Sequence, residues 1–368
     1  MKLMRYIVVL VAVLATFGCQ RRPLEYYYKP EAKMLLEIDW SDFPEKPTGV
    51  TVFIFKEGEA PRSITTSEVN KPEFTISAGR YKMYVMNQSM TEIGGVNFED
   101  MSSYENAEAI LSKVTSKWYS VLKGVISSNE GEGLIGVGIQ PDDLGIGIIP
   151  EFEITAAEVQ DYQYKYAKWR KGKGKKDGDG EAADDAPYDK DAPVIRTIKV
   201  MPHNVVSQLK VKVNVHNVQN LYTVRASFER LAESFLLTQG TTSQKEVAQL
   251  IEQWNLTKTS DDGKIGYVEG MISTFALPNG ETSALNRSPQ ANVLTVQCLH
   301  SDKKTYTSEV FEVGDKLKIT LSPKYYRMLI EVEVGPIYLP NHDPGGDGGG
   351  FVSYVEDWDD EVDIDIPI

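Results

Sequence analysis

The chain has 368 residues, of which 41% are hydrophobic and 25% are charged, and this composition excludes a disordered or fibrous protein. At roughly 150 residues per domain, the length predicts about two domains with hydrophobic cores of their own. The formal net charge of -14 argues against a nucleic-acid partner, because binding to phosphates requires a concentrated basic surface.

Residues 1–18 have the order of a secretory signal peptide. Lys2 and Arg5 precede an apolar run at residues 6–17, and Gly18 ends the segment. The apolar run is shorter than the roughly 20 residues that a membrane-spanning helix needs. We therefore expect the mature chain to be exported without spanning a bilayer.

Cys19 directly follows the predicted signal peptide. Residues 16–19 resemble a bacterial lipobox, in which a peptidase cuts before Cys and the thiol receives lipid, although Thr16 stands where Leu is usual. We predict that acylated Cys19 anchors the protein to a lipid bilayer, with residues 19–32 as a lipidated tether. The alternative is a secreted protein with a free Cys near its start.

Residues 33–160 show the period-two alternation of strands with one buried face, which predicts an N-terminal β-sandwich domain. Residues 50–55 are apolar on both faces, as in a central strand, and residues 80–86 predict another strand. Apolar spacing favours a short helix at residues 103–113. The first strand of the domain has one apolar face, formed by Met34, Leu36, Ile38 and Trp40.

Residues 161–193 are predicted to form a charged, Gly-rich loop or linker. A basic run at residues 165–176 precedes glycines and acids, and such blocks bury too little apolar area to order themselves. A polyanion-binding patch is the alternative for the lysines. An EF-hand calcium loop starting at Asp177 is excluded, because Ala182 and Tyr188 replace the required Gly and Glu.

Residues 194–340 return to short alternating strands, which predicts a C-terminal β-sandwich domain. The clearest strand has Leu209, Val211, Val213 and Val215 on one face. A short helix is expected at residues 244–254, and the Gly-x-Gly pair at Gly145 and Gly147 is expected to mark a bulge or tight loop. Further strands are predicted at residues 222–228, 266–275, 292–300, 306–313, 317–321 and 328–334.

Residues 341–368 combine a Gly-rich hinge with an acidic terminal strand. Pro367 confines that strand to an edge or to its last pairing. Its apolar face makes it a candidate donor strand, formed by Val362, Ile364, Ile366 and Ile368. The neighbouring acids form a solvated edge or a calcium site, and they are Asp357, Asp359, Asp360 and Glu361.

No catalytic, metal or cofactor motif stands out in the sequence, so we expect no enzyme, no metal and no cofactor. The four histidines are scattered, without the spacing of a zinc site. Cys298 lies in an alternating stretch, where a buried structural thiol is expected rather than a nucleophile. Aromatic pairs for a ligand platform are Trp118 with Tyr119 and Tyr325 with Tyr326, and the alternative for both is burial in the core.

Several segments resemble a fimbrillin-related family of Bacteroidota lipoproteins whose function is uncharacterised. The resemblance spans most of the mature chain. It is carried by residues 19–25, 38–40, 46–52, 79–81 with Asn87, 101–109, 231–235 and 273–278.

This resemblance implies two tandem transthyretin-like antiparallel β-sandwich domains, with one or two short helices, at the outer membrane. It also implies assembly by strand addition, in which a C-terminal strand of one subunit fills a groove left after an N-terminal strand is removed proteolytically from another. The proteases of that system cut after Arg. This chain departs from the pattern, because no Arg lies between residues 40 and 50, and the first one beyond is Arg62.

Two functions remain open from the sequence. The first is a lipid-anchored outer-membrane structural or adhesion protein, such as an anchor or accessory fimbrial subunit with other fimbrial subunits as partners. The second is a stand-alone outer-membrane lipoprotein that binds glycan or another ligand. Acidic residues associated with surface display do not directly follow Cys19. The sequence therefore allows the protein to face either the cell surface or the periplasm.

Overall fold

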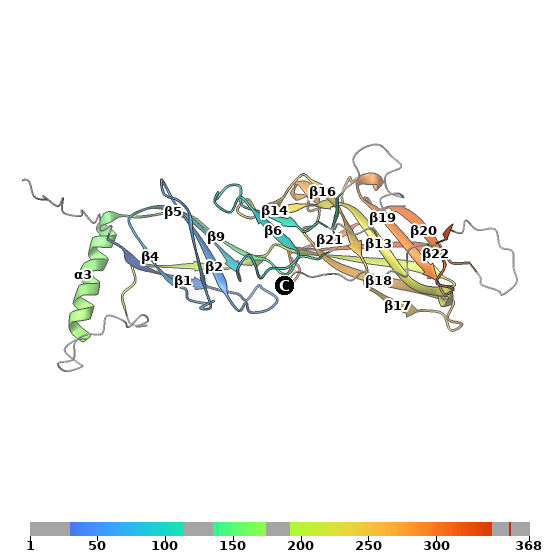
Figure 1. Cartoon of the computed structure of the whole chain (residues 1–368), viewed down its shortest axis with the longest axis horizontal. Coiled ribbons are helices and arrows are strands. Elements are labelled where there is room, and N and C mark those ends of the chain that lie inside the picture. Colours follow the sequence, from blue (N-terminus) through green and yellow to red (C-terminus); the bar gives the residue numbers. More distant parts are fainter. Residues whose placement is uncertain (1–29, 114–134, 138, 174–191, 341–352, 355–368) are drawn as a thin grey trace, which may run out of the picture. The chain divides into compact units, whose positions relative to one another are not determined.

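A computed structural model shows a chain built mainly of β-strands (Figure 1). It describes residues 30–113, 135–137, 139–173, 192–340 and 353–354. The all-β fold class predicted from the alternating pattern is confirmed. Strand β12 (Ser207–His216) is the clearest case, because buried and half-buried residues alternate along its whole length.

Two sheets contain the strands nearest the N-terminus. One has the order β10-β1-β4, and the other has the order β11-β9-β5-β2-β3. Because β2 has a neighbour on each side, its apolar residues occupy both faces of a central strand, as predicted. The bounds are β1 (Ala32–Ile38), β2 (Val50–Lys56), β3 (Arg62–Thr66), β4 (Glu73–Ile76), β5 (Gly79–Asn87), β9 (Gly145–Ile154), β10 (Arg196–Val200) and β11 (His203–Asn204).

Two glycines of β9 permit a close approach to the opposite layer. A Cβ atom on Gly147 would lie 2.7 Å from Cγ2 of Val200, and one on Gly145 would lie 2.8 Å from Cε2 of Phe43. Residues with side chains do not fit at these distances. The Gly-x-Gly pair therefore marks a packing contact at the start of β9, where a tight loop was one of the two expectations and is wrong.

Two larger sheets carry the C-terminal part of the chain. Their orders are β17-β18-β12-β22-β21 and β23-β20-β19-β13-β16-β8. The strands predicted after residue 205 are confirmed, with shifts of a few residues at their ends. The bounds are β8 (Ile135–Val137), β13 (Leu221–Ala232), β16 (Glu246–Ile251), β17 (Trp254–Lys258), β18 (Ile265–Thr274), β19 (Val293–His300), β20 (Thr305–Glu312), β21 (Lys318–Leu321), β22 (Met328–Tyr338) and β23 (Ser353–Tyr354).

A fifth sheet, with the order β15-β14-β7-β6, joins distant segments. It pairs β6 (Val96–Glu99) and β7 (Glu108–Leu111) with β14 (Ser234–Leu236) and β15 (Thr241–Thr242). Similarly, β10 and β11 follow the predicted linker but pair with β1 and β9. Strand pairing thus crosses the expected domain limits, and the limits themselves stay a prediction.

The expected antiparallel pairing has exceptions. Strand β1 runs parallel to β10, β12 runs parallel to β22, and β16 runs parallel to β8. Long connections separate the two strands of each parallel pair, as parallel pairing requires. The alternation of apolar residues is the same in both arrangements, so it could not distinguish them.

Both helices predicted from apolar spacing are wrong. Residues 103–113 contain β7, and residues 244–254 contain β16. Strand β16 lies between β13 and β8 and buries five consecutive residues, so its apolar run imitates a helical pattern. The α-helix of the described residues is α3 (Ala156–Lys173), and it lies in the segment predicted to be a loop.

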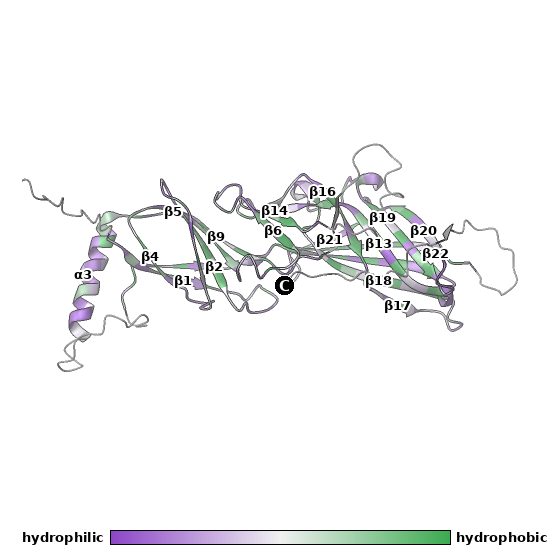
Figure 2. Ribbon diagram, viewed as in Figure 1, coloured by the Kyte–Doolittle hydropathy of each residue, from purple (hydrophilic) through white to green (hydrophobic). Residues whose placement is uncertain are grey.

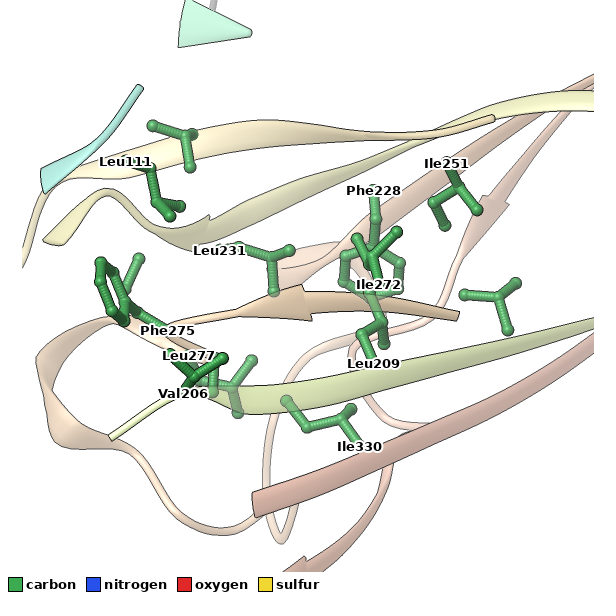
Figure 3. Packing of buried hydrophobic residues seen from close by; sticks show 14 of the residues in the cluster. Leu111, Val206, Leu209, Phe228, Leu231, Ile251, Ile272, Phe275, Leu277 and Ile330 are labelled. Carbon is green, nitrogen blue, oxygen red and sulfur yellow. The ribbon is translucent and has the colours of Figure 1, made fainter. Parts of the chain in front are cut away.

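The chain forms two compact units. The described part of the first unit comprises residues 30–33, 75–78, 154–173 and 192–195. The second unit contains the remaining described residues and most of the sheets. Its core includes Leu209, Phe228, Ile272 and Ile330, each at most 1% exposed (Figure 3). Burial of each such side chain contributes about 1.5 to 3 kcal/mol to stability.

Candidate functional site

Strand β1 is central to the assembly question, because the sequence resemblance involves loss of an N-terminal strand. The predicted apolar face is confirmed, with Met34 and Leu36 fully buried and Ile38 6% exposed. Strand β1 lies between β10 and β4, and residues 34–38 pair in parallel with residues 196–200. It is therefore an internal strand of its sheet.

Backbone and side-chain hydrogen bonds hold β1 and the residues after it. The amide of Leu36 donates to the carbonyl of Pro72 at 3.1 Å, and that of Ile38 donates to Asn70 at 2.8 Å. The indole Nε1 of Trp40 donates to the carbonyl of Val69 at 2.8 Å in a buried bond. Loss of β1 would expose these groups together with its apolar face. Arg62, the first Arg after β1, lies exposed on edge strand β3.

Strand β20 presents a partly open edge. On its outer side β23 pairs at two positions only, Tyr354 opposite Thr305 and Ser353 opposite Tyr306. Residues 307–312 have no strand partner on that side within the described ranges, and Val310 is 56% exposed. An unpaired strand edge with an apolar side chain can accept a further strand.

Several predicted site residues lie outside the described residues. They are Cys19, the acids Asp357, Asp359, Asp360 and Glu361, the pair Trp118 and Tyr119, and the candidate donor residues Val362, Ile364, Ile366 and Ile368.

Tyr325 and Tyr326, the other candidate platform, are half-buried. The Lys324 ammonium lies 4.4 Å from the centre of the Tyr325 ring, and the Tyr325 carbonyl accepts a hydrogen bond from Asn204. Burial raises the pKa of Tyr326. These contacts favour a structural role for this pair over an exposed platform.

A buried polar cluster around Asn204 was missed in the sequence. The side-chain oxygen of Asn204 accepts hydrogen bonds from the amides of Leu144 and Val206, at 3.2 and 3.0 Å. Its Nδ2 donates to Oδ1 of Asp143 at 2.7 Å and to the carbonyl of Tyr325 at 3.0 Å. The cluster ties residues 143–144 to residues 204–206 and 325. A polar residue directly before two buried valines was the available signal.

Asn87 makes a second bridge beside this cluster. Its Nδ2 donates to the carbonyl of Asp143 at 2.9 Å, and its Oδ1 accepts from the amide of Gly145 at 2.7 Å. Burial raises the pKa of Asp143, against the opposing effect of the hydrogen bond from Asn204. Both asparagines are at most 5% exposed, so the cluster positions backbone and is not a solvent-facing site.

A polar pocket of about 620 Å³ lies on the second unit, lined by residues that include Arg230, Glu246, Glu281 and Arg287. Arg287 forms an ion pair with Glu281, and its Nη2 donates to Oδ1 of Asn292 at 2.8 Å. Its Nε is buried without a hydrogen-bond partner among the described residues. The pocket offers two guanidinium and two carboxylate groups, a combination suited to polar ligands.

The remaining chemistry-bearing residues have structural environments. Cys298 is fully buried, as expected for a structural thiol, and burial raises its pKa to about 12. His300 contacts the hydroxyls of Thr305 and Thr307, and His203 contacts Asp42. In the part of the chain that is described, no group of three or more His, Cys, Asp or Glu residues could hold a metal ion. Helices there are not long and apolar enough to cross a membrane.

A family model described as a domain of unknown function, DUF5119, matches residues 18–252. The chain belongs to the DUF5119 family. This agrees with the expectation, drawn from the sequence resemblance, of a family whose function is uncharacterised. No curated relative matches this DUF5119 chain.

Solved structures similar to this DUF5119 chain include a proposed adhesin from Bacteroides ovatus, at 17% identity and a TM-score of 0.47, covering 88% of this chain and 99% of that one. A proposed polysaccharide-binding protein from Bacteroides thetaiotaomicron has 6% identity, a TM-score of 0.44 and coverage of 82% and 90%. The fimbrial anchor protein Mfa2 from Porphyromonas gingivalis has 12% identity, a TM-score of 0.38 and coverage of 72% and 77%. At these TM-scores the likenesses carry no conclusion about the activity or partners of the chain.

Proposed function

We propose that the chain is a lipid-anchored, fimbrillin-like structural or adhesion protein of the outer membrane, without catalytic activity. Acylated Cys19 holds it to the bilayer, on the cell surface or the periplasmic face. It acts as an anchor or accessory subunit that joins other fimbrial subunits by β-strand addition. The burial of β1 inside its sheet, with no Arg between it and β2, is the observation that supports this proposal.

Retention of β1 distinguishes an anchor or accessory subunit from a polymerising one. Under the resemblance, polymerising subunits give up an N-terminal strand to open a groove. Here the face formed by Met34, Leu36 and Ile38 is buried, and each of these side chains contributes about 1.5 to 3 kcal/mol on burial. Residues 39–49 also contain no Arg at which an Arg-specific protease could separate β1 from β2.

The C-terminal segment supplies the other half of the assembly proposal. Val362, Ile364, Ile366 and Ile368 share one face of a potential strand, which suits them to fill alternate pockets along another subunit's open edge. The described residues that precede the segment, 353–354, pair with β20 at a sheet edge.

Digestion by an Arg-specific protease tests retention of β1. We expect the treated wild-type chain to keep residues 32–38 on one polypeptide with β2, as shown by N-terminal sequencing. Glu45 is exposed between the two strands, so Glu45→Arg provides a matched control with a cleavable site. Loss of residues 32–38 from the wild type, under conditions that cut only this control, would contradict the anchor proposal.

Deletion of residues 358–368 tests the donor strand. If the segment is a donor, the unfolding midpoint should stay unchanged while strand-mediated complexes disappear from size-exclusion chromatography. If it is an internal strand, the midpoint should fall by several degrees. The lipid anchor is tested separately, because Cys19→Ala should release the chain from membranes during a carbonate wash.

The pocket beside Arg287 favours a second candidate function, the capture of a glycan or another polar ligand. Arg230 lines the pocket with a side chain that is 48% exposed, so it can be changed without opening the core. Binding to a glycan array should then be weaker for the Arg230→Gln variant than for the wild type. The Arg80→Gln variant is the control and should bind like the wild type, because the Arg80 side chain is 59% exposed and does not line the pocket. Equal binding by both variants would exclude the pocket as the ligand site.

A further inference from the structure

Helix α3 begins at a capping box that fixes its start. The hydroxyl Oγ1 of Thr155 accepts a hydrogen bond from the amide of Glu158 at 3.2 Å, and Oε2 of Glu158 accepts one from the amide of Thr155 at 2.8 Å. Val159 and Tyr162 in its first half are buried, at 1% and 7% exposure. The first turns of the helix therefore belong to the packed part of their unit.

An aromatic row runs from the first half of α3 into its second half. The rings of Tyr162 and Tyr166 lie 5.8 Å apart, and those of Tyr166 and Trp169 lie 5.5 Å apart. Tyr166 and Trp169 are half-buried, while Tyr164 is 71% exposed. Tyrosine and tryptophan are the residues that favour the boundary between lipid and water, because each combines an apolar ring with a polar group.

Charge is segregated along the same helix. Both acidic residues, Glu158 and Asp161, lie in the first half, and Asp161 pairs with Lys165 at 2.6 Å. Residues 162–173 contain no acid and five basic residues, which are Lys165, Lys168, Arg170, Lys171 and Lys173. The helix is predominantly hydrophilic, as its colours in Figure 2 show. It is too polar to enter the membrane interior, so its contact with a bilayer would be through charged headgroups.

Helix α3 contacts residue 31, which lies close along the chain to the predicted lipid anchor at Cys19. Nε2 of Gln163 donates a hydrogen bond to the carbonyl of Glu31, and the amide of Ile195 donates to the carbonyl of Lys33 at 2.7 Å. Residue 31 follows Cys19 by twelve residues, which span at most about 40 Å when fully extended. A bilayer that holds the lipid on Cys19 is thus within reach of α3.

We propose that α3 lies on the membrane surface and binds the anionic phospholipid headgroups of the leaflet that holds the anchor. The inference rests on the proposed lipidation of Cys19 for its geometry. Lysines 165, 168 and 171 are exposed and supply the charge complementary to phosphate. Tyr164, which is 71% exposed, supplies an aromatic group for the interface. The contact orients the protein relative to the bilayer, which a lipid anchor alone does not.

Lysine footprinting on reconstituted vesicles tests this contact. The mature protein is inserted into vesicles of phosphatidylethanolamine with phosphatidylglycerol, or of phosphatidylcholine alone, and treated with a water-soluble amine reagent. We expect labelling of Lys165, Lys168 and Lys171 to be about fivefold slower on the anionic vesicles, and the protection to vanish in molar salt. Lys304, Lys316 and Lys318 are exposed elsewhere and serve as internal controls.

Vesicle flotation separates the failure of this inference from that of the lipid anchor. A chain that floats with both vesicle types but shows equal labelling overturns the helix contact and leaves the anchor intact. A chain that floats only with anionic vesicles at low salt overturns the anchor and supports the contact. Protection by soluble polyphosphate equal to that by vesicles would assign α3 to a polyanion and overturn the membrane contact.

Matched triple variants test whether the lysines of α3 make the contact with the membrane. Changing Lys165, Lys168 and Lys171 together to Gln should abolish the salt-sensitive difference between the two vesicle types, as read from the labelling of Lys173 or from flotation of chains that lack the lipid. Changing Lys304, Lys316 and Lys318 to Gln removes the same charge and should leave the difference in place. If both variants behave alike, the effect is one of net charge and the contact at α3 is excluded.

Discussion

Nδ2 of Asn204 lies 2.7 Å from Oδ1 of Asp143, in a cluster where Asn204 also accepts two backbone hydrogen bonds. All the hydrogen-bonding capacity of this buried side chain is thereby used. Asn204→Ala would leave the amides of Leu144 and Val206 without their partner. We expect it to lower the free energy of unfolding by about 2 to 4 kcal/mol.

Chemical denaturation measures this loss, with Asn97→Ala as the control because Asn97 is exposed. Asn204→Asp adds a further test, since it places a second carboxyl group beside Asp143. That variant should regain stability as the pH falls, because protonation of either carboxyl group relieves the repulsion. A change of less than about 0.5 kcal/mol in Asn204→Ala would mean that water replaces the amide without cost.

Glu229 predicts a pH-dependent contribution to stability. Burial raises its pKa from 4.5 to about 7 in the folded chain, with nearby Arg230 opposing the shift. Below about pH 4.5 the carboxyl is neutral in both the folded and the unfolded chain, so its burial does not lower the free energy of unfolding through charge. Stability is lost between about pH 4.5 and 7, because over this range the unfolded chain ionises while burial keeps the folded carboxyl protonated. Glu229→Gln should therefore raise the unfolding midpoint at pH 8 by a few degrees, and the gain should vanish near pH 4.5.

Thermal unfolding across this pH range is the measurement. Glu309→Gln is the control, because this substitution removes the same formal charge at a residue that is exposed on β20. A gain that does not depend on pH would show that better packing, and not ionisation, explains the effect.

A substitution in the buried face of β1 should lower the free energy of unfolding strongly, although β1 lies close to the N-terminus. Leu36 is fully buried, and Leu36→Ala should cost about 2 to 5 kcal/mol through lost burial and the cavity left behind. Leu285→Ala removes the same atoms at a site that is 80% exposed and should cost little. Urea denaturation compares the two. Equal losses would mean that β1 contributes nothing to the stability of the sandwich.

Cys298 should be inert in the folded chain. Its pKa is raised to about 12 by burial, so almost no thiolate exists at pH 8, and no atom of the side chain reaches solvent. In a Cys19→Ala chain it is the remaining thiol. An aromatic disulfide reagent should react with it only as fast as the protein unfolds, and immediately in guanidinium. Rapid labelling of the native chain would contradict the buried position.

Strands were predictable from the sequence where one face is buried. The alternation of Leu209, Val211, Val213 and Val215 with polar residues is a local pattern, and burial follows it residue by residue. The face of β1 was predictable for the same reason. The partner strands within each sheet were not predictable. For example, the parallel pairing of β1 with β10 depends on residues that are far apart in the chain.

Elements buried on both faces, and elements held by long-range contacts, could not be predicted from local sequence patterns. Strand β16 shows apolar residues at helical spacing only because both of its faces are covered. Helix α3 lacks an apolar stripe, yet the Thr155 and Glu158 capping box was visible in the sequence. The Asn204 cluster joins three segments, and no local pattern marks the carboxylate or carbonyl that it contacts.

The position of β22 has a consequence for biosynthesis. This strand is among the last to be made, yet it sits inside its sheet, with residue 208 of β12 paired to residue 329. β12 is made long before β22, so the edge of β12 that β22 pairs with stays open while more than a hundred residues follow. An exported chain must therefore keep this open edge from pairing with other chains until residue 338 has been delivered, and truncated products should be cleared by proteolysis.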